Sequence, residues 1–413
     1  MAEAYIIDAC RTPRGIGRQG KGALADMHPQ QVGSAVLKAI AARNNINTAE
    51  VDDIIWGCSS QRGPASGDLG RMSALDAGYD IKASGVTLDR FCGSGITSVN
   101  IAAASIMSGM EDLVIAGGCE LMSMPPGPRD PNAGPGTMDR GNMRLRKMHP
   151  QSHQGVCADA IATLEGITRE AVDALALESQ KRADAAIRGG HFAKALIPVY
   201  KEDGTLALDH EEFPRPNTTA EGLAGLKASF EAMADIPLGE DGMTFRKLIT
   251  QVYPDLDIKF IHHAGNSSGV VDGAGAVLLA SKEYAEKNGL KPRARVVAMA
   301  NMGDSPTLML NAPVPAARKV LAKAGLTLDD IDLFEINEAF AVVAEKFIRD
   351  LKLDRDKVNV NGGAMALGHP IGATGSMLIG TVLDELERRD LRRGLVTMCA
   401  AGGMAPAIII ERV

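Results

Sequence analysis

The order of segments in the first half of this chain is repeated in the second half. The matching pairs are Gln31–Asn45 with Ala316–Ala324, Thr48–Gly57 with Thr327–Ile336, and Cys92 with His369. Cys92 follows Thr48 by 44 residues, and His369 follows Thr327 by 42 residues. Each half alternates β-like and helical runs and ends on an apolar strand followed by two glycines. This pattern predicts two similar α/β units with buried sheets.

Between the two halves lies a segment of different character. It holds a loop rich in Pro, Gly and Asn (Met124–Asn142), a basic run (Arg144–His149) and an amphipathic helical segment (Arg169–Arg188). Regular amphipathic segments are typical of a folded domain, so we expect an inserted domain and not a linker. The expected boundaries are residues 1–121 for the first half, completed by about 260–285, residues 122–259 for the inserted domain, and residues 286–413 for the second half.

Composition excludes several classes of function. With 413 residues, 45% of them hydrophobic and 23% charged, the chain is typical of a soluble globular protein of two or three units. A formal net charge of −7 and few aromatic residues argue against nucleic-acid binding. The sequence shows no signal-peptide pattern and no apolar run near the ~20 residues of a membrane span. We expect a cytoplasmic protein without a transmembrane segment.

Six cysteines are scattered along the chain without a C-x-x-C pair. Neither a metal site nor a redox dithiol is therefore expected. Four of them have the surroundings of small buried hydrophobic residues: Cys10, Cys58, Cys119 and Cys157. Cys92 and Cys399 differ because glycines follow them closely.

Cys92 lies in Arg90-Phe-Cys-Gly-Ser-Gly95, between a short β-like run and the helical segment Ile96–Met107. A cysteine at such a strand-to-helix turn lies near the positive end of the helix dipole, which favours the nucleophilic thiolate. A buried cysteine in a tight turn is the alternative interpretation of this segment taken alone.

Two further segments carry polar groups suited to catalysis. His369 lies within the glycine-rich run Gly362–Gly375 and before a proline. Because glycines have no side chains that could cover the imidazole, we predict a catalytic role for His369. Asn337-Glu-Ala-Phe340 follows a predicted strand, Ile331–Ile336, and polar groups at strand ends often line sites, although Asn also caps helices. A thiol nucleophile, a base and amide donors are what carbon–carbon bond formation between acyl thioesters requires.

In this order, the four segments resemble the thiolase family (acetyl-CoA acyltransferases and acetyl-CoA C-acetyltransferases). The likeness spans essentially the whole chain and includes Ala116–Ser123, Arg215–Ala224 and Gly265–Ala274. The resemblance implies an α/β thiolase fold, with duplicated βαβαβαββ halves in a five-layer α-β-α-β-α core and an inserted loop domain that binds coenzyme A. It also implies ping-pong acyl transfer: thiolytic cleavage of 3-ketoacyl-CoA by CoA, or the reverse Claisen condensation.

The resemblance also implies residue roles. Cys92 would be the nucleophile that accepts the acyl group, and His369 the base that activates it. Cys399 would remove the α-proton of acetyl-CoA. Asn337 would hold a water in the oxyanion hole for the enolate, with His369 as the other donor. The backbone N–H groups of Cys92 and Ala401 would form the second oxyanion hole.

Coenzyme A and acyl-CoA are expected as substrates, with no cofactor bound permanently and no metal. The resemblance places Ser268 beside the pantetheine arm, and His153 is a further candidate contact. Lys227 and the run Arg144–Lys147 are candidates for the nucleotide phosphates. As partners the resemblance implies a second copy of the chain, as a homodimer or homotetramer, or a subunit carrying β-oxidation hydratase and dehydrogenase activities.

The chain departs from the family pattern at three places. Cys399-Ala-Ala-Gly-Gly carries Ala401 where relatives often have glycine, and a positive φ there would be costly. Some fatty-acid-degrading members share this segment, which favours β-oxidation. Gln154 replaces a methionine common in acetoacetyl-CoA-forming members, which argues against a strict short-chain preference. Glu231–Phe260 is longer than usual and includes a predicted helix at Phe245–Tyr253. Three interpretations of this segment are open: a surface elaboration, a cover over the substrate tunnel, or a contact with a partner subunit.

Four alternatives stay open at this point. A β-ketoacyl synthase shares the fold, but it would use Cys-His-His, against which Cys399 and Asn337–Phe340 argue. A lipid-carrying relative would be expected to lack Asn337–Phe340. The chain could also be an acetoacetyl-CoA-forming biosynthetic enzyme, or a non-catalytic CoA-binding subunit of a multienzyme complex.

Overall fold

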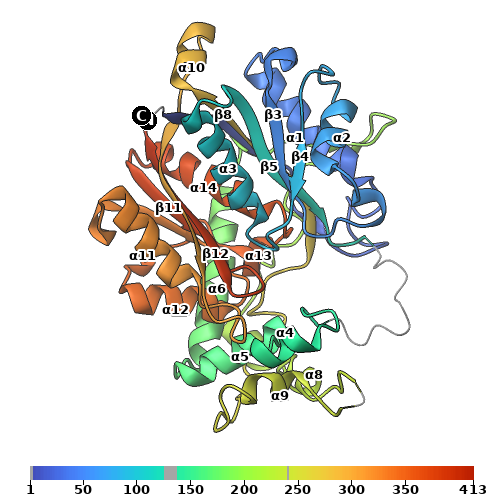
Figure 1. Cartoon of the computed structure of the whole chain (residues 1–413), viewed down its shortest axis with the longest axis vertical. Helices are drawn as coiled ribbons and strands as arrows, with labels where there is room; N and C mark the ends of the chain where they lie inside the picture. Colours follow the sequence, from blue (N-terminus) through green and yellow to red (C-terminus); the bar gives the residue numbers. More distant parts are fainter. Residues whose placement is uncertain (1–2, 125–136, 240) are drawn as a thin grey trace.

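The computed structural model describes residues 3–124, 137–239 and 241–413. Most of the loop predicted at Met124–Asn142 lies outside these residues. The described chain forms two α/β halves that stand side by side, with a group of helices below them in the view of Figure 1.

The first half is built on a five-stranded sheet in the order β4-β3-β5-β8-β1, and the short β2 pairs with β8. The strands are β1 (Ala4–Arg11), β2 (Gly15–Ile16), β3 (Asp53–Gly57), β4 (Val86–Leu88), β5 (Leu113–Leu121) and β8 (Val271–Ser281). β3 pairs in parallel with β4 and β5, whereas β8 is antiparallel to β5 and β1. Every residue of β5 and β8 is buried, as expected for strands covered on both faces.

The second half repeats this arrangement in the order β10-β11-β12-β9. The strands are β9 (Ala294–Gly303), β10 (Leu333–Ile336), β11 (Arg393–Thr397) and β12 (Met404–Arg412). β10 and β11 are parallel, the other pairs are antiparallel, and a parallel bridge from Phe334 to Val358 stands where β4 stands in the first half. The predicted duplication is therefore confirmed. A short pairing between β1 and β9 joins the two sheets at their edges.

Helices form the other layers of the core (Figure 1). They are α1 (Pro29–Arg43), α2 (Leu69–Asp76), α3 (Ser94–Ser108), α10 (Lys282–Asn288), α11 (Pro313–Ala324), α12 (Ala341–Leu351), α13 (Ala364–Leu367) and α14 (Thr374–Arg388). α1 and α2 cover the first sheet, α11 and α12 cover the second, and α3 packs on α14 between them. The predicted five-layer core is confirmed. Prolines near their first positions start α1 and α11 slightly earlier than their hydrophobic periodicity predicted.

Between β5 and β8 the chain forms the group of helices that we call the loop domain. Its elements are α4 (Met143–Met148), α5 (Gln154–Leu164), α6 (Arg169–Arg188), the hairpin β6 (Val199–Tyr200) and β7 (Leu206–Leu208), α7 (Ala220–Ala224), α8 (Glu231–Ala234) and α9 (Phe245–Thr250). α6 has the predicted bounds, whereas α9 is shorter than the predicted Phe245–Tyr253. α5 and α6 pack on α12, and α6 also packs on α13, so these helices rest on the second half, whereas β6 packs on α1 of the first half.

Among the described residues, Phe91–Ser108 has the length and hydropathy of a possible membrane span. This stretch is 61% buried inside the fold and includes α3, which packs on both sheets and on α14. Its apolar composition is therefore explained by its place in the central layer.

Candidate active site

The loops that carry Cys92 and His369 meet where the two central helices begin. Gly95 is the second residue of α3, and Gly375 is the second residue of α14. A Cβ on Gly375 would lie 2.1 Å from the backbone nitrogen of Ile96, and a Cβ on Gly95 would lie 2.8 Å from that of Gly375. Only glycine permits this approach. The equivalent turns of the two halves therefore face each other, as the duplication predicted.

A buried carboxylate, Glu120 at the end of β5, ties these loops together. It accepts hydrogen bonds from the backbone N–H groups of Ser59 (2.9 Å), Ser60 (2.9 Å) and Gly372 (2.8 Å), and Gly372 belongs to the His369 loop. Our sequence analysis assigned Glu120 no role. An acidic residue at the end of an otherwise apolar strand was the available signal, because a buried carboxylate requires donors.

Cys92 is partly exposed and follows Phe91, whose φ is +50°. Burial, and then the charge of Glu120, raise the pKa of the Cys92 thiol to about 12. The predicted preference for the thiolate at the helix end is therefore not supported, because burial has a larger effect on the thiol pKa than the helix dipole. A base must take the proton from Cys92 before or during nucleophilic attack.

His369 is buried, and its hydrogen bonds determine its tautomer. Its Nδ1 lies 2.6 Å from the Thr374 hydroxyl, which itself donates to the Pro370 carbonyl at 3.0 Å. Since that hydroxyl proton is committed, Nδ1 must carry the proton that the pair shares, and Nε2 is left as the acceptor. Burial, and then the charge of Arg14, lower the pKa of His369 to about 3. The imidazole is thus neutral near pH 7, as a base must be.

The Nε2 atom of His369 has no hydrogen-bond partner within the described parts of the chain. The same holds for both polar side-chain atoms of Asn337, which is 1% exposed and whose backbone N–H donates to Thr397 at 3.3 Å. Buried polar atoms without partners are rare, and they mark places where a ligand or water completes the hydrogen bonding.

Cys399 lies in the turn after β11 and is 1% exposed. Burial and then the nearby Cys92 raise the pKa of its thiol, so the two sulfur atoms lie within electrostatic range of each other. A Cβ on Gly93 would come within 3.3 Å of the Ala400 side chain, which also brings the two cysteine turns together. Four predicted catalytic residues thus come from turns that the fold draws toward one region.

Ala401 does not carry the backbone strain considered above. The positive φ angles of this turn belong to Gly402 (80°) and Gly403 (76°), and Ala401 has none. Its N–H, like that of Cys92, donates to no other described residue. Both groups are therefore available to an oxyanion.

Ser268 lies between the turns of Asn337 and His369. Its N–H donates to Ala339 (2.9 Å), while the carbonyl of the next residue, Gly269, accepts from the His369 N–H (2.9 Å). Nearby, a cavity of about 200 Å³ is lined by loop-domain and core residues that include Arg215, Leu226 and Gly265. The motif that begins at Arg215 indicates the family, but no pattern in the sequence indicates that Arg215 lines a cavity.

The other predicted CoA contacts differ in their surroundings: one is packed between aromatic rings, one is exposed and one is in a buried ion pair. His153 caps α5 through Nδ1, which accepts from Gly155 at 3.1 Å, and its ring packs between those of Phe230 and Phe245. Lys227 is exposed on the loop domain. Arg146 forms a buried ion pair with Asp139 and is therefore structural, which corrects its assignment to a phosphate contact.

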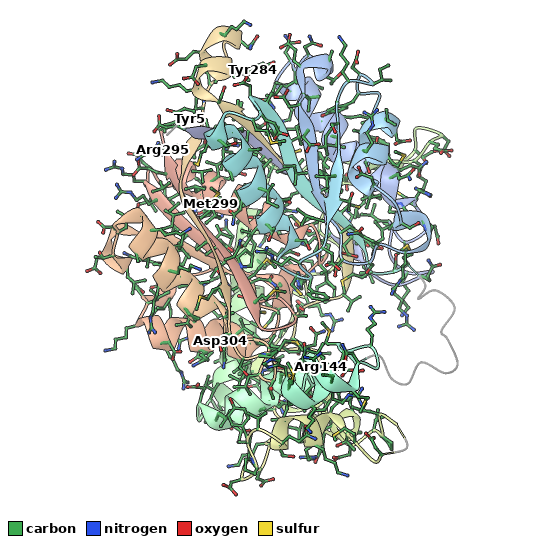
Figure 2. All side chains as sticks on the ribbon, viewed as in Figure 1. Tyr5, Arg144, Tyr284, Arg295, Met299 and Asp304 are labelled. Carbon is green, nitrogen blue, oxygen red and sulfur yellow. The ribbon has the colours of Figure 1, made fainter. Side chains whose placement is uncertain are left out.

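Arg144 and Lys147 are exposed on α4, and Figure 2 marks Arg144 below the two sheets. Neither forms an ion pair with a described residue. They therefore remain available to an anionic ligand.

Family models and known proteins match this chain over its length. The model of the thiolase N-terminal domain matches residues 4–237, and that of the thiolase C-terminal domain matches residues 290–412. A steroid 3-ketoacyl-CoA thiolase of Mycobacterium tuberculosis is 40% identical, covering 100% of this chain and 95% of its own length. A 3-oxoadipyl-CoA/3-oxo-5,6-dehydrosuberyl-CoA thiolase of Escherichia coli is also 40% identical, with full coverage of both proteins.

The crystal structure of the Bacillus anthracis acetyl-CoA acetyltransferase superposes with a TM-score of 0.84 at 33% identity, covering 100% of this chain and 99% of the other. Fold and sequence agree over the whole length, which confirms the family predicted from the four segments. The chain belongs to the thiolase family and is an acyltransferase.

Proposed function

We propose that this enzyme cleaves 3-ketoacyl-CoA with coenzyme A through an acyl-Cys92 intermediate, in fatty-acid β-oxidation or a related degradative sequence. The observation that carries the proposal is the set of unpartnered buried atoms, Nε2 of His369 and the side chain of Asn337, beside two cysteines. A purely structural or CoA-carrying subunit would have no need of such atoms.

In the first half-reaction, His369 takes the proton of Cys92, whose sulfur attacks the keto carbon of the substrate. The resulting oxyanion is stabilised by the N–H groups of Cys92 and Ala401. The bond between the α-carbon and the keto carbon then breaks, which leaves the acyl group on Cys92 and an acetyl-CoA enolate. The enolate oxygen is held by His369 and by a water on Asn337, and Cys399 protonates the carbon.

In the second half-reaction, the thiol of coenzyme A attacks the thioester on Cys92 and yields the shortened acyl-CoA. The same N–H pair stabilises the second oxyanion. His369 returns its proton to the sulfur of Cys92 as that sulfur leaves, and Cys399 recovers a proton from the thiol of coenzyme A. Coenzyme A enters as a substrate and not as a resident cofactor. We propose residues 122–259 as its domain, with Ser268, His153 and Arg215 along the pantetheine path and Lys227, Arg144 and Lys147 nearer the phosphates.

We further propose substrates larger than acetoacetyl-CoA. Relatives with 40% identity are named for steroid and dicarboxylic 3-ketoacyl substrates. Gln154 replaces the methionine of acetoacetyl-forming members, and Phe245 of the long Glu231–Phe260 segment packs 5.6 Å from the His153 ring. The longer segment thus lies beside a proposed CoA contact, which favours the substrate-tunnel interpretation over a surface elaboration.

Thiolysis rates over a series of 3-ketoacyl-CoAs test the proposal. We expect kcat/KM to rise by about tenfold or more from acetoacetyl-CoA to longer or ring-bearing chains, since each buried CH₂ contributes about 0.8 kcal/mol. A maximum at acetoacetyl-CoA would instead support the biosynthetic alternative, for which a 37% identical acetyl-CoA acetyltransferase of Syntrophomonas wolfei is the precedent. Absence of both thiolysis and an adduct on Cys92 would overturn the enzymatic proposal.

We also propose that the protein is a cytoplasmic homo-oligomer. All six cysteines are free, as is usual in a reducing compartment. The edge strand β4, the neighbouring α2 and the connection between them expose apolar side chains, which are Met72 and Leu75 on α2, Ile81 in the connection and Val86 on β4. An exposed apolar sheet edge is suited to pairing with a second copy of the chain.

A further inference from the structure

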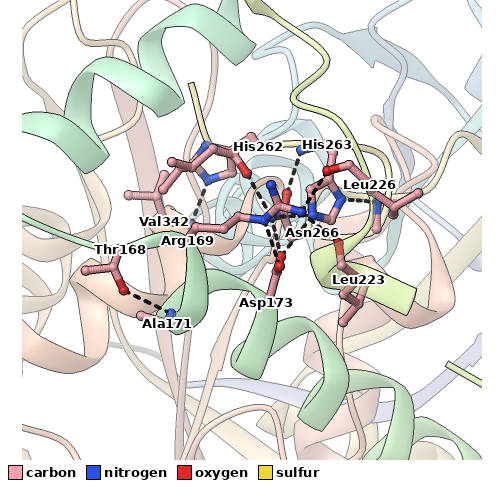
Figure 3. Close-up of polar contacts among 12 residues, drawn as sticks. Thr168, Arg169, Ala171, Asp173, Leu223, Leu226, His262, His263, Asn266 and Val342 are labelled. Atoms are coloured by element: carbon pink, nitrogen blue, oxygen red, sulfur yellow. Dashed lines mark hydrogen bonds and ion pairs between the residues drawn. The ribbon is translucent and has the colours of Figure 1, made fainter. Parts of the chain in front are cut away.

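The helix that follows the Asn337 turn lacks a cap of its own. α12 begins directly after Asn337–Phe340, and Phe340, at its N-cap position, has no side-chain acceptor. The first amides of α12 are instead bound by a distant segment. The Ala341 N–H donates to the Asn266 carbonyl at 3.0 Å, and the Val342 N–H donates to Nε2 of His262 at 3.4 Å (Figure 3).

His262 is held for this contact by Asp159 of α5. Both side chains are completely buried, and Nδ1 of His262 lies 2.7 Å from Oδ1 of Asp159. Because Nε2 accepts from Val342, Nδ1 must carry the proton and donate it to the carboxylate. The imidazole also packs edge-on against the Phe340 ring, at 5.8 Å and 86°. Asp159 and His262 therefore support both the turn and the helix that follows it.

The position of Asn337 depends on such backbone anchors. Its side chain has no hydrogen bond within the described residues, so nothing inside the chain orients the amide directly. On the strand side, the Asn337 N–H donates to the Thr397 carbonyl. Within the turn, the Asn337 carbonyl accepts from the Ala339 N–H, and the Ala339 carbonyl accepts from the Ser268 N–H. At the start of α12, the Asn266 carbonyl and the His262 imidazole add two further anchors.

We propose that His262, oriented by Asp159, is a positioning residue for Asn337 in the enolate oxyanion hole. The inference rests on the role proposed above for Asn337. Loss of the Val342 contact frees the first turn of α12, which lets the Asn337 amide shift from the place where its water meets the enolate oxygen. Acyl transfer to Cys92 uses the other oxyanion hole and is not affected by that shift.

The neighbouring His263 is a natural control. It is equally buried and pairs with another aspartate, Asp173 of α6, at 2.9 Å, while its Nδ1 accepts from Gly265 (Figure 3). Asp173 also binds Arg169 and Asn266. His263 itself makes no hydrogen bond to the Asn337–Phe340 turn in the described structure.

The test compares H262N, H262Q and H263N in the full-length protein. Asn at 262 can still donate to Asp159 but does not reach Val342, whereas Gln places an acceptor near the position of Nε2. Two steps are measured: deuterium uptake into the methyl group of acetyl-CoA, which requires the enolate, and the rate of acetyl labelling of Cys92. We expect H262N to slow deuterium uptake by about 10- to 100-fold with labelling within about twofold, the scale that a small displacement produces.

H262Q should recover most of the uptake, and H263N should lower both steps by the same factor together with the melting temperature. Equal losses of both steps in H262N and H263N would overturn the inference.

N337A separates the two proposals. If N337A retains deuterium uptake, the proposed role of Asn337 fails. If uptake is lost in N337A but normal in H262N, only the positioning role of His262 is contradicted. Should H262N not fold, H262M replaces it, because methionine fills the space without an acceptor for Val342.

Discussion

The hydroxyl of Thr374 controls the chemistry available to His369. It accepts from Nδ1 and donates to Pro370, so Nε2 keeps the free lone pair that a base needs. Burial keeps the ring neutral and also keeps the thiols of Cys92 and Cys399 protonated. Before reaction, the imidazole and the two thiols are therefore uncharged. Negative charge develops on the oxyanions during the reaction, and prearranged N–H donors stabilise it.

Replacement of Thr374 by valine should lower kcat by about 10- to 100-fold with little change in KM, because the imidazole loses the acceptor that selects its tautomer. Thr374→Ser is the matched control, since it keeps the hydroxyl, and we expect it to stay within about threefold of wild type. Steady-state thiolysis with one 3-ketoacyl-CoA measures both. Equal activity of the valine and serine variants would contradict this account of the tautomer.

At the scale of elements, the site depends on how closely the ends of α3 and α14 approach. Gly95 and Gly375 occupy the same place in the two helices, and Glu120 binds the loop before α14 to the first half. The catalytic turns are thus attached to two rigid helices and a buried carboxylate, and not to flexible surface loops. Such support favours a site that is already formed before substrate binds.

Gly375→Ala should separate these helices, because the added Cβ would overlap the backbone of Ile96. We expect a loss of several degrees in melting temperature and at least a tenfold loss of activity, as for other overpacked interiors. Gly303→Ala is the control, since a Cβ there meets no atom within 4 Å. Calorimetry and thiolysis rates on both variants check this, and a Gly375→Ala protein that melts and reacts like the control would argue against close contact.

At the scale of the whole molecule, the outer edge of β4 pairs with no other strand among the residues that the structure describes. β4 ends the first sheet, and Val86 on it and Met72 on the adjacent α2 are partly exposed apolar residues. Since the Cys92 turn follows β4 directly along the chain, a second copy seated on this edge would also support the nucleophile. Assembly and activity should therefore be coupled.

The double variant Met72→Asp/Val86→Asp should dissociate to a monomer of 43.4 kDa and lose activity. Charged residues on a paired edge are strongly unfavourable. Ile236→Asp, on the loop domain and similarly exposed, serves as the control and should keep the wild-type mass in light scattering. A double variant that keeps the oligomeric mass would place the interface elsewhere.

Much of this molecule could be predicted from short stretches of sequence. The duplication, the helix at Arg169–Arg188 and the reactive character of Cys92 and His369 follow from periodicity, spacing and glycine-rich surroundings, which are local properties. Local properties also led to one wrong prediction, on the protonation of Cys92. The helix end beside Cys92 predicted a thiolate, but burial by distant residues has the larger effect on the thiol pKa.

By itself, then, the sequence determined the duplicated fold and the family, and it predicted the reactive groups, since periodicity and motifs are properties of neighbouring residues. Only the tertiary structure decided how these groups are held. The anchoring by Glu120 and the cap that His262 places on α12 depend on which buried polar groups find partners. Those partners are often 60 to 250 residues away along the chain, for example Gly372 for Glu120 and Val342 for His262. Which buried polar groups form hydrogen bonds depends on the complete fold, and it cannot be predicted from a short stretch of sequence.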